Sequence, residues 1–90
     1  MSDAIAHATL HLLDLRDLPP PLPMERILAR LDRLQPGERL LALTPFYPAP
    51  LLALLAQSGF AYDAQAAGDG ARLVICHDTD RHLLDSPLPP

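Results

Sequence analysis

Hydrophobic residues near the N-terminus follow first an alternating pattern and then a helical one. From Thr9 to Arg16, leucines alternate with polar residues, which is typical of a strand. Prolines cluster at residues 19–23, where their fixed φ and missing N–H end a strand and suit a first helical turn. From Met24 to Leu34, apolar residues recur at helical spacing and form one stripe. The pattern predicts a strand followed by a helix.

The rest of the chain predicts a second strand and helix and then two more strands. Four segments carry these patterns: a nearly continuous apolar run at 38–44, a leucine-rich helical stripe at 48–58, and strand patterns at 60–65 and 72–77. Gly59 is suited to end the second helix, and Gly68-Asp69-Gly70 is a strong hairpin signal.

The order of these segments predicts an α/β fold, a two-layer sandwich of order βαβαββ. Right-handed crossovers would place both helices on one face of a four-stranded mixed sheet. A length of 90 residues predicts a single domain over 1–90. We expect an ordered core over about 9–78 and a mobile, proline-rich tail at 79–90.

The second face of this sheet is expected to be apolar and uncovered by helices. Leu10, Leu12, Leu40 and Val74 are predicted to lie on it. An uncovered apolar face on so small a protein implies a protein partner, and a homodimer is the commonest solution. The alternative is that the C-terminal tail folds back over this face.

Composition narrows the classes of function. The hydrophobic share of 49% excludes a disordered chain, and the longest apolar runs, such as residues 51–56, are too short to span a bilayer. Met1-Ser2-Asp3 does not look like a signal peptide, and a single cysteine fits a reducing compartment, so we expect a cytoplasmic protein. The net charge of -4, with 7 scattered basic residues, argues against nucleic-acid or membrane partners.

Three stretches resemble the TusA-like (SirA-like) superfamily, and within it the branch described as domain of unknown function 2249. They are residues 13–23, the Gln-Pro-Gly-Glu junction at 35–38, and Ser58-Gly59-Phe60. The sulfur carriers of this superfamily hold a reactive cysteine in the turn before the first helix, where this chain has Pro20. The branch often carries a histidine before the second helix, and residues 44–48 have none. The resemblance implies the fold and an accessory role near redox or nitrogen-oxide metabolism, without the persulfide chemistry.

The candidate binding residues gather at the sheet edge where the helices begin. Arg16 and Asp17 follow the first strand, and ligands of open α/β sheets bind at this edge. Arg16 is a candidate anion ligand; alternatively, it pairs with Asp17 or Glu25 to fix the turn. Phe46 and Tyr47 stand between prolines at the same edge, where they either anchor a partner or cap the core.

Cys76 is the only thiol, and it is either a sulfur or redox site or a small core residue. The four histidines, His7, His11, His77 and His82, show no metal-ligand spacing, and His11 could meet His77 only on neighbouring strands.

These observations favour a non-catalytic binding or protein-interaction module, without cofactor or metal. No Ser/His/Asp pattern, phosphate-binding glycine loop or recognisable carboxylate pair predicts an enzyme. The alternatives are a sulfur-transfer or redox accessory acting through Cys76, and a metal or small-ligand carrier using histidines.

Overall fold

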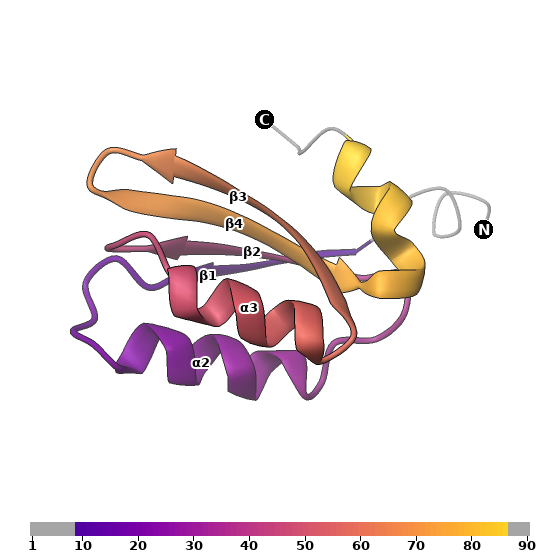
Figure 1. The fold of residues 1–90 in the computed structure, drawn as a ribbon, viewed down its shortest axis with the longest axis horizontal. Helices are drawn as coiled ribbons and strands as arrows, with labels where there is room; N and C mark the ends of the chain where they lie inside the picture. Colours follow the sequence, from indigo (N-terminus) through magenta and orange to yellow (C-terminus); the bar gives the residue numbers. More distant parts are fainter. Residues whose placement is uncertain (1–8, 87–90) are drawn as a thin grey trace.

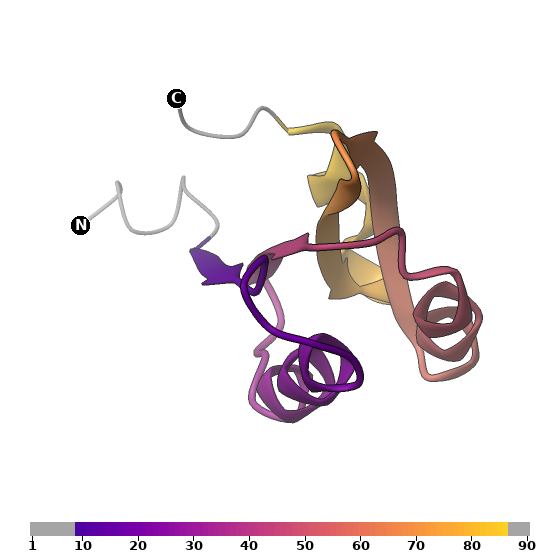
Figure 2. The same ribbon diagram turned by 90° about the vertical axis from the view of Figure 1, so that its left-hand side faces the viewer.

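The computed structural model describes residues 9–86 and forms two layers, a sheet and a pair of helices (Figure 1). The elements are β1 (Leu10–Asp14), α2 (Leu22–Leu31), β2 (Arg39–Thr44), α3 (Ala49–Gln57), β3 (Phe60–Ala67), β4 (Gly70–His77) and the 3-10 helix η1 (Asp78–Asp85). Both α-helices cover the same face of the sheet, and η1 lies across the sheet from them (Figures 1 and 2). The predicted α/β sandwich of order βαβαββ is confirmed, with η1 added after the last strand.

The sheet is mixed, with the strand order β1-β2-β4-β3. β1 and β2 are parallel, whereas β4 is antiparallel to both of its neighbours, β2 and β3. The hairpin predicted around residues 68–70 joins β3 to β4 and inserts β4 beside β2. As a result, β1 and β3 form the two edges, and the apolar strand β4 is central.

Prolines begin both α-helices. Pro21 directly precedes α2, and Pro48 directly precedes α3. A proline in the first turn loses nothing by lacking an N–H, because that N–H has no partner within the helix. Gly37 and Gly59 adopt φ of +86° and +88° in the turns that follow the helices. Both turns therefore use the left-handed conformation that glycine adopts readily.

The core lies between the helices and alternate residues of the sheet. Its largest fully buried hydrophobic side chains, from both layers, are Ile27, Leu40, Leu51, Leu55, Leu73 and Ile75. Leu40 was predicted on the opposite face, and that prediction is wrong: Leu40 is opposite Ile75 and 0% exposed. On β2 the residues that face away from the helices are its odd-numbered neighbours, Leu41 and Leu43, because side chains alternate along a strand.

The expected mobile tail is wrong for the residues up to 86. Residues 78–85 form η1, which packs on β3 and β4. Two contacts distant in sequence fix it: the Gly37 N–H donates to Asp80 Oδ2 at 2.7 Å, and the Arg39 side chain donates to backbone carbonyls near the end of η1. The composition of the C-terminal segment, which ends in prolines, did not indicate these hydrogen bonds to distant residues. Residues 87–90 lie outside the described part of the chain.

Ile27→Ala is expected to lower the free energy of unfolding by about 2–5 kcal/mol, because it leaves a cavity between α2 and the sheet. The control is Arg26→Ala, on the exposed side of the same helix, which should change stability by roughly 0.5 kcal/mol or less. Urea unfolding followed by circular dichroism measures both. Equal losses would contradict the packing of α2 described above.

Candidate functional site

Arg16 is held by a carboxylate of its own strand end. Its Nε and Nη2 donate to the two Asp14 carboxylate oxygens at 2.8 and 2.7 Å. This bidentate pair lowers the pKa of Asp14 to about 2 and raises the pKa of Arg16. The expected partners, Asp17 and Glu25, make no ion pair with Arg16. The pair fixes the beginning of the turn and occupies the Nε–Nη2 edge of the guanidinium.

An apolar groove lies between the starts of α2 and α3. It measures about 180 Å³ and is lined by Pro20, Pro21, Pro23, Met24, Ile27, Phe46, Pro48, Pro50 and Leu51. Pro20, from the proline cluster before α2, is therefore part of its wall. Within residues 9–86, no ionisable side chain lines the groove. It offers van der Waals contact to an apolar group and no acid, base or nucleophile.

The two aromatic candidates have different positions. Phe46 lines the groove and is 36% exposed, whereas Tyr47 does not line it and is 47% exposed. Thr44 fixes this turn, because its buried hydroxyl donates to the Phe46 carbonyl at 2.8 Å. Sequence reasoning identified both proline turns but missed that they converge on one groove. The groove could have been predicted from the sequence, because each proline turn precedes a helix at the same edge of the sheet.

The sheet face opposite the helices is divided into two halves. η1 covers the half formed by β3 and β4. On the other half, Leu10, Leu12, Leu41 and Leu43 form what we call the apolar strip. Leu12 is opposite Leu41 and is 62% exposed. The other three leucines are partly exposed. The prediction that Leu10, Leu12 and Val74 share this face is confirmed by the register, and Val74 is buried.

Cys76 lies beneath η1 and is 0% exposed. Its Sγ is 3.4 Å from the Asp80 carbonyl oxygen, to which it donates. Burial raises the pKa of the Cys76 thiol, with the charge of Asp80 acting in the same direction. A thiol that is both buried and protonated is a poor nucleophile. Sulfur or redox chemistry at Cys76 would require η1 to move away.

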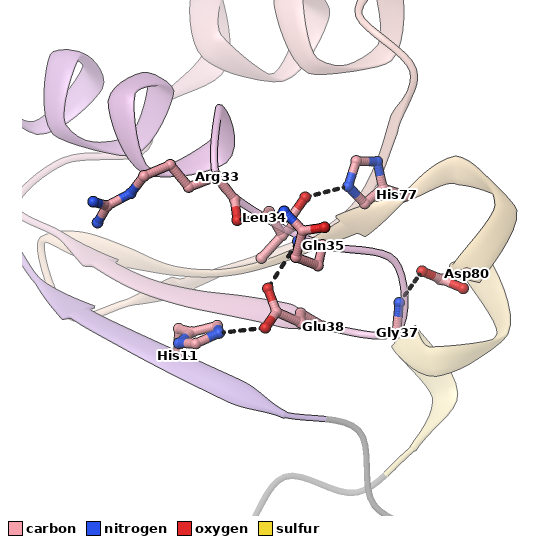
Figure 3. Close-up of polar contacts among 8 residues, drawn as sticks. All are labelled: His11, Arg33, Leu34, Gln35, Gly37, Glu38, His77 and Asp80. Carbon is pink, nitrogen blue, oxygen red and sulfur yellow. Dashed lines mark hydrogen bonds and ion pairs between the residues drawn. The ribbon is translucent and has the colours of Figure 1, made fainter. Parts of the chain in front are cut away.

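Two histidines contact the loop between α2 and β2 (Figure 3). His11 Nε2 lies 3.1 Å from Glu38 Oε2, and the Gln35 N–H donates to Glu38 Oε1 at 2.8 Å. The Gln35 N–H and the neighbouring His11 lower the pKa of Glu38. His77 Nε2 lies 2.7 Å from the Leu34 carbonyl oxygen. β2 separates the strands of the two histidines, so they hold opposite sides of the same loop without forming a pair.

The remaining histidines do not join this cluster. His82 is exposed on η1, and His7 lies outside the described residues. Within residues 9–86, no three His, Cys, Asp or Glu side chains are close enough to hold a metal ion together. None of the helices in that range has the length and apolar character needed to cross a bilayer.

Comparison with known proteins finds one family. A family model described as an uncharacterized conserved protein (DUF2249) matches residues 12–78. No curated protein and no solved structure matches the chain. The matched range contains the groove, the apolar strip except Leu10, and Cys76, and it ends at the first residue of η1.

Asp14 is expected to titrate at a pKa of about 2, against an ordinary value of 3.8. Because the folded pKa is the lower one, the pair stabilises the fold above about pH 4 and loses this effect as the pH falls toward 2. A ¹³C NMR titration of the carboxyl group measures the pKa. Arg16→Gln should return it toward 3.8; an Asp14 that titrates there in the unaltered protein would contradict the pairing.

Cys76 is expected to resist iodoacetamide in the folded protein and to react readily in denaturant, because it is buried and its thiol pKa is raised. Mass spectrometry of the intact chain counts the added groups. The control is a Tyr47→Cys/Cys76→Ala double variant, whose exposed thiol should be alkylated under native conditions. Equally fast native labelling at Cys76 would reopen the thiol hypothesis.

Proposed function

We propose that this chain, which belongs to the DUF2249 family of uncharacterized conserved proteins, is a non-catalytic protein-interaction module that binds a second copy of itself. The binding surface is the apolar strip of β1 and β2. The observation that carries the proposal is the position of Leu12, which is 62% exposed among three other leucines on a sheet face. Contiguous apolar surface of this kind marks interaction sites on small proteins.

A second copy is the occupant that the surface fits best. The strip contains only leucine side chains, so it is complementary to itself across a two-fold axis, as an isologous interface requires. Burying one exposed leucine contributes about 1.5–3 kcal/mol. The strip lies on a sheet face, and two such faces from two copies can stack on each other.

The burial of Cys76 and the apolar lining of the groove support a non-catalytic role. On a TusA-like scaffold, the turn before the first helix would carry the reactive cysteine, and Pro20 supplies only an apolar wall. The single cysteine supports a cytoplasmic location, and the resemblance supports an accessory role near redox or nitrogen-oxide metabolism. The alternative of a thiol-based accessory protein has less support, because Cys76 is buried. The alternative of a histidine-based carrier also has less support, because His11 and His77 each contact the 34–38 loop.

Native mass spectrometry and light scattering after size exclusion test the proposal. The unaltered chain should be a dimer, and Leu12→Asp should weaken dimerisation by roughly a hundredfold or more, because it places a charge in an apolar interface. Tyr47→Asp is the control and should leave the dimer intact, because Tyr47 is exposed in the turn between β2 and α3 and is not part of the apolar strip. A monomeric unaltered chain, or an unaffected Leu12→Asp dimer, would refute the proposal. Far-ultraviolet circular dichroism verifies that each variant is folded.

A further inference from the structure

Arg39 is a buried cation that has no carboxylate partner among the residues that the structure describes. It stands at the start of β2 and is 6% exposed. Its Nη1 donates to the carbonyls of Leu83 and Ser86 at 3.3 and 3.2 Å. Between residues 9 and 86, its Nε has no hydrogen-bond partner and no carboxylate lies within 4.0 Å of its guanidinium. Burying a charge is costly unless an opposite charge compensates for it.

A cavity of about 160 Å³ lies beside this guanidinium, on the half of the sheet covered by η1. Besides Arg39, its polar lining residues are Asp63, Gln65, Arg72 and Ser86. The Arg72 side chain is exposed to solvent, and its Nη2 donates to Gln65 Oε1 at 3.1 Å. The cavity thus has one buried and one accessible guanidinium.

The lining specifies both the charge and the size of a ligand. Two guanidinium groups and the Asp63 carboxylate leave one net positive charge, which matches a monoanion. A dianion such as phosphate would meet Asp63 with twice the charge. Val74 and Leu84 supply an apolar wall. The volume is close to that of a cavity of roughly 150 Å³ that holds one benzene molecule, so the ligand is small.

We propose that this cavity binds a short organic carboxylate. The carboxylate group accepts hydrogen bonds from Arg39 and Arg72, the geometry for which guanidinium is suited. The hydrocarbon part packs against Val74 and Leu84. Because Leu84 belongs to η1, the ligand joins η1 to the sheet. This site is separate from the apolar strip, and dimerisation is not required for it.

Sodium butyrate is the probe, with sodium chloride at the same ionic strength as the reference. Titration of the full ¹⁵N- and ¹³C-labelled chain is followed by NMR at the Arg39 and Arg72 side-chain N–H groups and the Leu84 methyl groups. We expect saturable shifts at all three residues with a Kd of about 1 mM, which is well within the limit for so small a ligand. Matching shifts from sodium chloride would overturn the proposal.

Variants separate binding from structure. Arg72→Gln removes an exposed guanidinium and should weaken butyrate binding about tenfold or more without lowering the unfolding temperature. Arg26→Gln, on the opposite layer of the molecule, is the matched control and should bind like the unaltered chain. Asp63→Asn removes the competing carboxylate and should bind butyrate at least as tightly.

Two further outcomes would count against the proposal. Equal butyrate affinity in the unaltered chain and in Arg72→Gln would leave Arg39 as a structural cap of η1 alone. Sodium phosphate that binds as tightly as butyrate, without shifting the Leu84 methyl groups, would refute the assignment to an organic carboxylate. Dimerisation is measured separately with Leu12→Asp, so failure of one proposal does not decide the other.

Discussion

A four-stranded sheet with both α-helices on one face leaves its second face, which is partly apolar, to be shielded from water by something else (Figures 1 and 2). The rest of the structure depends on this constraint. The 3-10 helix η1 covers the half over β3 and β4, where Cys76 is buried, and its end also contacts the buried Arg39 at the start of β2. Over β1 and β2 the face keeps its leucines exposed. The apolar strip and the arginine-lined cavity both arise from this division.

Periodicity predicted most of the fold because it is a local property. The proline cluster at 19–23 and the glycine turns marked where elements end, and alternating leucines marked the strands. The face of β2 was harder, because its run of apolar residues offers no contrast between two sides. Leu40 was therefore placed on the wrong face. Only the register opposite Ile75 determines its direction.

The sites were less predictable because they depend on contacts between distant segments. Arg39 falls within the run at 38–44 that predicts a strand, and nothing in that run indicates its partners, the carbonyls of residues 83 and 86. The groove combines two turns that are separated by a helix and a strand. Arg16 illustrates a different difficulty: its partner, Asp14, is only two residues away in sequence, whereas the expected partners were Asp17 and Glu25. No linear spacing distinguishes a carboxylate that binds an arginine from one that merely accompanies it.

The position of η1 relative to the family match has one further consequence. The matched range stops at residue 78, and η1 extends from Asp78 to Asp85. A chain cut at that boundary would keep every strand and both α-helices. It would nevertheless uncover the Cys76 thiol and deprive the Arg39 guanidinium of both carbonyls that it now contacts. The boundary of sequence similarity and the boundary of the folding unit are thus different places in this protein, and a domain drawn from similarity alone would be chemically more reactive than the intact one.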